Sequence, residues 1–178
     1  MCVFMYIDLM MRAEDIHEIV DRLEAVGIAV WLDGGWGVDA LLGEETRPHD
    51  DLDIVMVMAQ LDAAQSVLRD LGFVLAVNEL PTRCVLRDAG DRRIDVHPVT
   101  FDGEGGGLQR QPDGSDFRYP PEGLAGTGVV AGQPVRCLTP ELQLRCHLAY
   151  EPDDDDRHDV HLLCERFGLT LPDAYKND

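Results

Sequence analysis

The chain has 178 residues, of which 45% are hydrophobic and 28% are charged. This length favours one compact domain, alone or with a small helical appendage, and the hydrophobic content excludes global disorder. The formal net charge of −19, from 34 acidic and 15 basic residues, disfavours sequence-independent binding to nucleic acid because an acidic surface repels phosphate backbones. The same charge suits a small cationic substrate, and equally an acidic soluble protein without one.

The N-terminal stretch is apolar but lacks the basic region and the small-residue cleavage site of a targeting signal, and it is too short to span a bilayer. Met10 and Met11 offer alternative translation starts, so residues 1–12 are interpreted as a possible N-terminal extension. The five cysteines form no C-x-x-C pair and are odd in number, which predicts reduced thiols in a cytoplasmic protein.

The first half of the chain alternates helices and strands. Residues Ala13–Gly27 have apolar side chains at helical spacing, which predicts an amphipathic helix ending at Gly27. The elements expected next are a strand over Ile28–Leu32, a turn at Gly34-Gly35, a helix over Trp36–Leu42, a loop over Glu44–Asp50, a strand over Leu52–Met58 and a helix over Leu61–Leu71.

The second half begins with three expected strands, over Phe73–Val77, Arg83–Arg87 and Arg92–Val99, the last two joined by a turn at Asp88–Asp91. The Gly- and Pro-rich segment Phe101–Gly128 is predicted to be a long loop or a loosely structured lid. A small hairpin over Val129–Cys137 and two closing helices, from Thr139 and from about Asp153, complete an α+β fold. We expect residues 1–137 to form one domain and residues 138–178 a helical segment packed on it.

Asp51 and Asp53 are the first candidate functional residues. Side chains at i and i+2 of a strand point the same way, so both carboxylates are expected on one face of an otherwise apolar strand. Aspartate is rarely buried unpaired and like charges repel, so a divalent metal ion between them would resolve both problems. The alternative is an exposed Asp51 with Asp53 capping the backbone or paired with an arginine.

Asp95 favours the metal interpretation. It lies in a second apolar strand, Arg93–Val99, and would join the pair if that strand neighbours Leu52–Met58. Three carboxylates can hold two Mg²⁺ ions about 3.5–4 Å apart, an arrangement suited to phosphoryl or nucleotidyl transfer. Asp95 could also accept the proton of an attacking hydroxyl.

Gly34 and Gly35 are the candidate phosphate-binding residues. A Gly-Gly turn lets the backbone approach a ligand closely, and the helix that follows directs free N–H groups at the same place. Arg47 and His49, in the loop before the aspartates, could reach phosphate oxygens, although a solvated loop residue is the simpler interpretation of each alone.

The order of these motifs resembles the nucleotidyltransferase superfamily typified by DNA polymerase beta. Within it, the segments DGGWGVDALLG (Asp33–Gly43), TRPHDDLD (Thr46–Asp53) and IDVHP (Ile94–Pro98) are similar to the lincosamide and aminoglycoside 2''-nucleotidyltransferases. Trp36 after Gly-Gly departs from the Gly-Ser of many superfamily members but matches the antibiotic-modifying branch. The resemblance is strong over about residues 31–99 and looser toward the C-terminus.

The resemblance implies a mixed sheet flanked by helices, with ATP and Mg²⁺ as co-reactants. Asp51 and Asp53 would bind metal, Asp95 would join them or act as base, and Gly34 and Gly35 would meet the triphosphate. The expected reaction is transfer of AMP from ATP to a hydroxyl of a small cationic acceptor, an aminoglycoside or a lincosamide, with release of pyrophosphate. No nucleic-acid or membrane partner is expected, and the oligomeric state stays open.

Two alternatives and three residues stay open at this point. The alternatives are a toxin- or antitoxin-type nucleotidyltransferase that modifies a macromolecule, and a non-catalytic nucleotide-binding module. His97 lies two residues after Asp95 and could contact substrate, orient Asp95 or simply end the strand. Arg157 and Asp159 could reach the nucleotide, but we favour a structural role in fixing the last helix.

Overall fold

A computed structural model describes residues 10–176, so Cys2 and most of the possible extension over residues 1–12 lie outside the described range. The helices are α1 (Ala13–Glu24), α2 (Gly34–Leu42), α3 (Leu61–Asp70), α4 (Pro140–His147) and α5 (Asp154–Phe167), with 3₁₀ turns η1 (Met58–Gln60), η2 (Pro121–Ala125) and η3 (Asp173–Tyr175). The strands are β1 (Val30–Asp33), β2 (Asp51–Val57), β3 (Val74–Glu79), β4 (Arg83–Arg87), β5 (Arg93–Phe101), β6 (Gly107–Arg110), β7 (Asp116–Tyr119), β8 (Thr127–Val130) and β9 (Gln133–Arg136).

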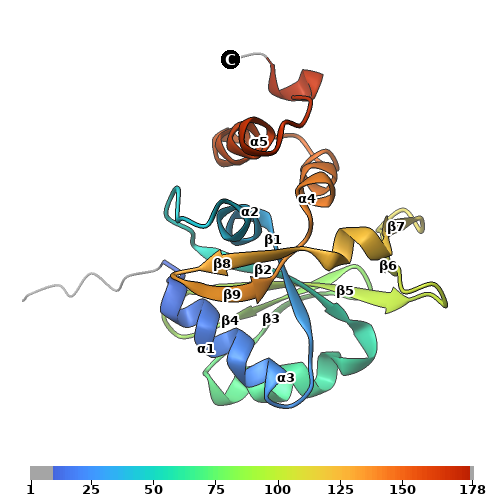
Figure 1. The fold of residues 1–178 in the computed structure, drawn as a ribbon. Coiled ribbons are helices and arrows are strands. Elements are labelled where there is room, and N and C mark those ends of the chain that lie inside the picture. The colour runs from blue at the N-terminus through green and yellow to red at the C-terminus, as the bar shows by residue number, and fades with distance from the viewer. Residues whose placement is uncertain (1–9, 177–178) are drawn as a thin grey trace, which may run out of the picture.

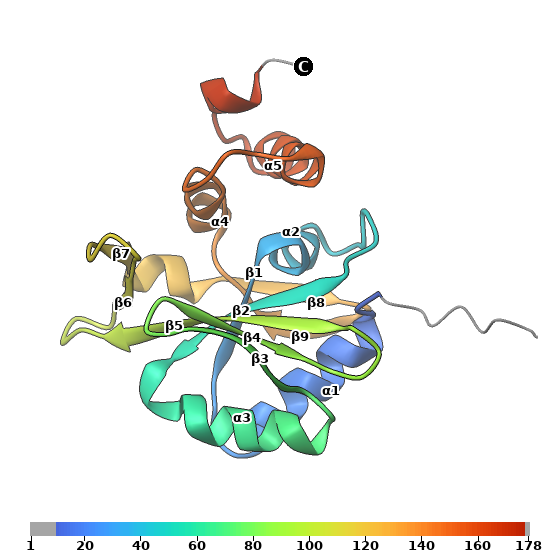
Figure 2. The same ribbon diagram turned by 180° about the vertical axis from the view of Figure 1, so that it is seen from behind.

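The main sheet has the strand order β1-β2-β5-β4-β3, and β6 and β7 extend it beyond the end of β5. Strands β2 and β5 are parallel, whereas the other paired strands run antiparallel. Figures 1 and 2 show α1 and α3 on one side of the sheet and α2, α4 and α5 on the other. The mixed sheet with flanking helices confirms the predicted α+β class, and the β2–β5 pairing confirms the expected proximity of the two aspartate-bearing strands.

Strict alternation in the central strands separates an apolar face from a functional face. In β2, Leu52, Ile54 and Met56 are fully buried and join the hydrophobic core formed with the apolar side chains of α1 and α3. Asp51 and Asp53 point to the opposite face, as the period of two requires. The helix α1 forms there because its apolar stripe matches this face of the sheet.

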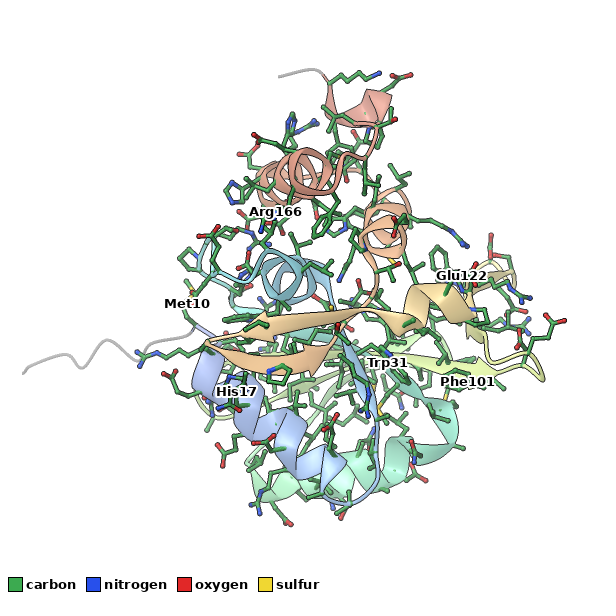
Figure 3. The ribbon with its side chains drawn as sticks, in the orientation of Figure 1. Met10, His17, Trp31, Phe101, Glu122 and Arg166 are labelled. Carbon is green, nitrogen blue, oxygen red and sulfur yellow. The ribbon has the colours of Figure 1, made fainter. Side chains whose placement is uncertain are left out.

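A second, smaller apolar cluster covers the other face beside the functional side chains. Its buried members are Val55, Val99, Tyr119, Leu124, Leu138 and Leu142. Trp31, from β1, packs against this cluster, and its indole N–H donates to the Leu124 carbonyl at 2.7 Å. Its ring lies 6.1 Å from that of Phe101, and both residues are labelled in Figure 3. This cluster holds η2 and α4 against the sheet.

The prediction of a long loop or loose lid over Phe101–Gly128 is wrong. The segment forms the β6–β7 hairpin, the turn η2 and the start of β8. Its glycines serve close packing: a Cβ on Gly107 would lie 3.0 Å from Val99 Cβ. Polar residues build the turns, since Asp102 N donates to the Gly106 carbonyl at 2.7 Å and Gln111 N to the Ser115 carbonyl at 2.8 Å. A turn-rich composition therefore encodes short strands here rather than a flexible lid.

The other elements follow the predicted order with shifted boundaries. The predicted hairpin over Val129–Cys137 is the β8–β9 pair, whose turn lies at Ala131 and Gly132. Within the described part of the chain, Cys84, Cys137, Cys146 and Cys164 carry free thiols, as expected. No helix of residues 10–176 is long and apolar enough to cross a membrane.

Gly37 controls how closely α2 and α4 approach each other. A Cβ at this position would lie 1.9 Å from Gln143 Nε2 and 2.8 Å from the Leu32 carbonyl oxygen. We expect Gly37→Ala to lower the free energy of unfolding by about 1–3 kcal/mol through overpacking, measured by urea denaturation. Gly103→Ala is the matched control, because nothing lies within 4 Å of its added methyl group, and equal losses in the two variants would contradict this interpretation.

Candidate active site

Three aspartates lie side by side across the centre of the sheet. In the strand register, Asp33 of β1 is opposite Asp53 of β2, and Asp53 is opposite Asp95 of β5. All three line one cavity on the face covered by α4. Three carboxylates in adjacent strands carry concentrated negative charge that only a cation can compensate without strain.

His97 lies two residues after Asp95 and joins this group. Single ligand atoms of Asp53, Asp95 and His97 all lie within 4.8 Å of one another. His97 Nε2 lies 3.2 Å from Asp53 Oδ1, so the ring contacts Asp53 rather than the adjacent Asp95. Burial lowers the pKa of His97, but the hydrogen bond and charge of Asp53, with the charges of Asp33 and Asp95, outweigh it and raise the pKa to about 9.

Asp95 has one paired and one unpaired carboxylate oxygen. Its Oδ2 accepts from Arg83 at 2.6 Å, and Arg83 also donates to Glu79 at 2.7 Å. Among the described residues, no donor reaches the buried Asp95 Oδ1. Burial raises the pKa of this carboxyl group to about 6; His97 and Arg83 oppose that shift, whereas Asp53 adds to it. A carboxylate with such a pKa can either ligate a cation or accept a proton near neutral pH.

Asp51 lies at the start of β2, opposite Arg93, and is not part of the group of ligand atoms formed by Asp53, Asp95 and His97. Burial and the neighbouring Asp53 raise its pKa to about 7. Its side chain shares a face with that of Asp53 because the two are separated by one residue. The predicted metal-binding role of Asp51 stays a prediction.

Gly34 permits a backbone approach that no other residue would. It has a φ of +57°, and a Cβ there would lie 2.4 Å from Asp53 Oδ2. The helix α2 begins at Gly34 itself, two residues earlier than predicted, with Asp33 as its N-cap accepting from Gly34 N at 2.8 Å. The first-turn N–H groups of α2 therefore lie beside the Asp53 carboxylate, where a metal-bound phosphate would meet them.

Arg47 and His49 lie beside Gly35, but each is engaged with a carboxylate. A Cβ on Gly35 would lie 2.5 Å from His49 Nδ1 and 2.6 Å from an Arg47 guanidinium nitrogen. Arg47 makes a two-pronged ion pair with the buried Asp159 of α5, at 2.9 and 2.6 Å. His49 Nε2 lies 2.6 Å from Asp39 Oδ2. Phosphate binding by Arg47 and His49 stays a prediction.

The two C-terminal residues left open by the sequence have structural contacts. Asp159 is 1% exposed and anchors α5 to the loop before β2 through Arg47. Arg157 donates to the Ala174 carbonyl at 3.0 Å, which ties α5 to η3. Both contacts agree with the structural role favoured for these residues.

The side chains of Asp33, Asp53 and Asp95 form a carboxylate row, and the cavity beside it has a volume of about 380 Å³. Its remaining walls come from β4, from the β6–β7 hairpin and from the end of α4. The residues beyond the carboxylate row and His97 that matter most are Arg83, Gln109, Phe117, Tyr119, Cys146, His147 and Tyr150. Sequence reasoning missed these residues and gave no role to Asp33. Only Asp33 had a usable signal, because it is an acidic residue directly after the expected apolar strand Ile28–Leu32.

The residues present fit a divalent metal ion. Carboxylate oxygens are the ligands that Mg²⁺ prefers, and Asp53 and Asp95 offer them from adjacent strands. The buried, unpaired Asp95 Oδ1 provides a further ligand atom whose burial is otherwise unfavourable. With metal bound, the site would carry a Lewis acid able to polarise a phosphate group.

Comparison with known proteins identifies the family. A family described as aminoglycoside-2''-adenylyltransferase matches residues 15–163, most of the chain. The chain belongs to the aminoglycoside-2''-adenylyltransferase family. It is therefore a nucleotidyltransferase, in agreement with the resemblance drawn from its motifs.

Two curated relatives show how far the similarity of this transferase extends. It is 29% identical over 150 residues to a lincosamide resistance protein from Staphylococcus haemolyticus, which covers 84% of this chain and 92% of that protein. It is 34% identical over 122 residues to a 2''-aminoglycoside nucleotidyltransferase from Klebsiella pneumoniae. That match covers 68% of this chain and 64% of the Klebsiella protein, slightly less than two thirds of its length.

Solved structures show the same fold. A lincosamide antibiotic adenylyltransferase with bound lincomycin matches the transferase with a TM-score of 0.79 and 27% identity, over 90% of this chain and 99% of that one. The enzyme ANT(2'')-Ia in complex with adenylyl-2''-tobramycin matches with a TM-score of 0.72 over 88% of this chain and 89% of that one. At 24% identity, the second match supports the fold alone.

Proposed function

We propose that this transferase moves AMP from ATP to a hydroxyl group of an antibiotic, with Mg²⁺ as cofactor and pyrophosphate as the second product. The observation that carries the proposal is the row of Asp33, Asp53 and Asp95 across adjacent strands, beside the N-terminus of α2. Carboxylates supply metal ligands, and a helix N-terminus supplies N–H donors for phosphate. ATP and Mg²⁺ make the cytoplasm the expected place of action.

Each group of site residues has a separate proposed role in nucleotidyl transfer. Asp51, Asp53 and Asp95 would hold two Mg²⁺ ions, which supply charge neutralisation of the triphosphate when bound. Gly34 and Gly35 bring the first turn of α2 against the phosphates, since bulkier residues would displace Asp53, His49 and Arg47. Arg47 and His49 would assist there only by releasing their present carboxylate partners.

Asp95 is proposed either as a further metal ligand or as the proton acceptor for the attacking hydroxyl group, because its one unpaired oxygen cannot hold a cation and take up a proton at once. It lines the cavity in which the acceptor would lie, and its unpaired Oδ1 is the atom available to receive the proton. A pKa of about 6 keeps this carboxyl group largely ionised at pH 7 and still basic enough for general-base catalysis. Arg83 holds the opposite oxygen, Oδ2, and thereby orients the carboxylate.

The cavity favours a lincosamide over an aminoglycoside as acceptor. Beyond the carboxylate row its walls carry no further acidic side chain and include the aromatic rings of Phe117, Tyr119 and Tyr150. The Arg145 guanidinium lies 4.4 Å from the centre of the Phe117 ring and adds positive charge at that wall. Such walls suit a ligand with apolar substituents and a single amine, as in a lincosamide, better than the several amines of an aminoglycoside.

A panel assay tests this proposal. Purified protein is mixed with ATP, Mg²⁺ and either lincomycin, clindamycin, tobramycin or kanamycin, and both pyrophosphate and the mass of the product are measured. We expect adenylylated lincosamide, with slower or no modification of aminoglycosides. Modification of aminoglycosides alone would overturn the lincosamide preference. ATP binding without turnover of any acceptor would instead support a non-catalytic binding module.

A further inference from the structure

Four side chains form a continuous hydrogen-bonded path from the cavity wall to the carboxylate row. Tyr119 OH donates to Gln109 Oε1 at 2.9 Å, and Gln109 Nε2 lies 3.2 Å from His97 Nδ1. His97 Nε2 in turn lies 3.2 Å from Asp53 Oδ1. Gln109 and Tyr119 are buried and come from the β6–β7 hairpin, the segment whose sequence suggested a loop.

A backbone carbonyl group fixes the orientation of the Gln109 amide. Gln109 Nε2 lies 2.8 Å from the Thr82 carbonyl oxygen, which can only accept a hydrogen bond. The atom facing Thr82 is therefore the amide nitrogen, and the atom facing Tyr119 is the amide oxygen. The opposite assignment would set two acceptors against each other inside a buried site, which is unfavourable.

This orientation of the amide determines which ring nitrogen of His97 carries the proton. The second N–H of the Gln109 amide points at His97 Nδ1, so Nδ1 must be the unprotonated, accepting nitrogen. The ring proton then resides on Nε2 and is donated to Asp53 Oδ1. The neutral ring with an Nε2 proton is the form that matches Gln109.

We propose that Gln109 is a positioning residue that holds His97 as a hydrogen-bond donor to Asp53, and that His97 is therefore not itself a metal ligand. An Nε2 atom that carries a proton cannot coordinate a cation. The hydrogen bond occupies Asp53 Oδ1 and leaves Oδ2, the oxygen nearest Gly34, to face the metal and the triphosphate. The inference rests on the proposed metal-dependent nucleotidyl transfer at this site.

Nitrogen-15 NMR of histidine side chains provides the direct test. In the ¹⁵N-labelled protein with Mg²⁺ added, we expect the His97 signals of a neutral ring protonated at Nε2, assigned by their loss in His97→Asn. In Gln109→Leu, which removes the amide but keeps a side chain of comparable bulk, this tautomer preference should disappear. A wild-type ring protonated at Nδ1, or at both nitrogens, would overturn the proposal. The readout does not depend on any acceptor, so failure of the antibiotic assay leaves it interpretable.

Metal affinity gives the second readout. We expect Gln109→Leu and Gln109→Glu to lower the affinity for Mg²⁺ in the presence of an ATP analogue by ~10–100-fold, as for other residues that orient metal ligands. Calorimetry measures this affinity. The introduced glutamate keeps the side-chain size, but its carboxylate cannot donate to His97 Nδ1 and would face the Thr82 carbonyl oxygen, so both variants lose the donor, and the tautomer signal in NMR separates this role from a merely structural one. Tyr119→Phe should change affinity less than either Gln109 variant, because Thr82 still orients the amide.

The matched control is Gln60→Leu. Gln60 also donates to a backbone carbonyl group, that of Gly27 at 3.2 Å, but it lies on η1, away from the cavity. We expect this variant to bind Mg²⁺ and the ATP analogue as the wild type does. Equal weakening in Gln60→Leu and Gln109→Leu, or no weakening in Gln109→Leu, would contradict the proposal.

Discussion

Asp53→Asn is expected to lower nucleotidyl transfer by a factor on the order of 10³ while leaving the fold intact. Asp53 is the central member of the carboxylate row, opposite both Asp33 and Asp95 in the strand register. Asparagine has the same shape and can still accept the hydrogen bond from His97, but it lacks the negative charge that holds a cation. The loss should therefore appear in catalysis and metal binding, not in folding.

Activity should fall in this variant without a fall in stability. Removing one charge from three adjacent carboxylates relieves repulsion, so the melting temperature without Mg²⁺ should be unchanged or higher. Steady-state pyrophosphate release and thermal denaturation measure the two effects. Asp70→Asn, an exposed aspartate at the end of α3, is the control for loss of one charge and should keep full activity. Retained turnover in Asp53→Asn would refute the metal-binding role.

Arg47→Ala is expected to destabilise the protein by about 3–5 kcal/mol, because it leaves the carboxylate of Asp159 buried without a partner. Only 1% of the Asp159 side chain is exposed, compared with 19% of Arg47. For a protein of this size, the loss corresponds to a melting temperature roughly 6–20 °C lower. Thermal and urea denaturation measure it directly.

Two further variants distinguish the effect of the buried Arg47–Asp159 ion pair on stability from that of an exposed ion pair. Arg136→Ala breaks an exposed ion pair, in which the side chain of Arg136 is 48% exposed and that of Glu24 is 41% exposed. It should lower the free energy of unfolding by only about 0–1 kcal/mol. Replacing the buried pair together, as Arg47→Met with Asp159→Leu, should recover most of the stability. If Arg47 also binds the triphosphate, this stable double variant will still show a raised KM for ATP; an unchanged KM would leave Arg47 with the structural role alone.

Much of the site could be predicted because β-strands have a simple geometry. The alternation of Asp51, Leu52 and Asp53 indicates which side chains share a face, and the apolar setting of Asp95 indicates a buried neighbouring strand. The parallel β2–β5 pairing confirms that Asp53 and Asp95 lie together, although their chemical roles stay predictions. Asp33 was missed because the first strand was expected to end at Leu32, one residue too early.

The rest depends on contacts that local sequence does not encode. Gln109 and Tyr119 lie in a segment whose glycines and prolines resemble those of a loop, and only pairing with β5 turns that segment into strands. The ion pair between Arg47 and Asp159 joins residues 112 positions apart. A loop arginine before a predicted metal site suggests phosphate binding, and nothing in its local sequence indicates a partner on the last helix.

The carboxylate row and the opposite wall of the cavity come from different elements of the fold, so they can change independently during evolution. The carboxylate row belongs to β1, β2 and β5, whereas much of the opposite wall belongs to the β6–β7 hairpin and the end of α4. On the proposed function, substitutions at Phe117 or Tyr150 would reshape the space for the acceptor without touching the carboxylate row. If these residues act as proposed, selection by a new drug would act on that wall first, and the range of modified antibiotics would broaden while the chemistry of transfer stays unchanged.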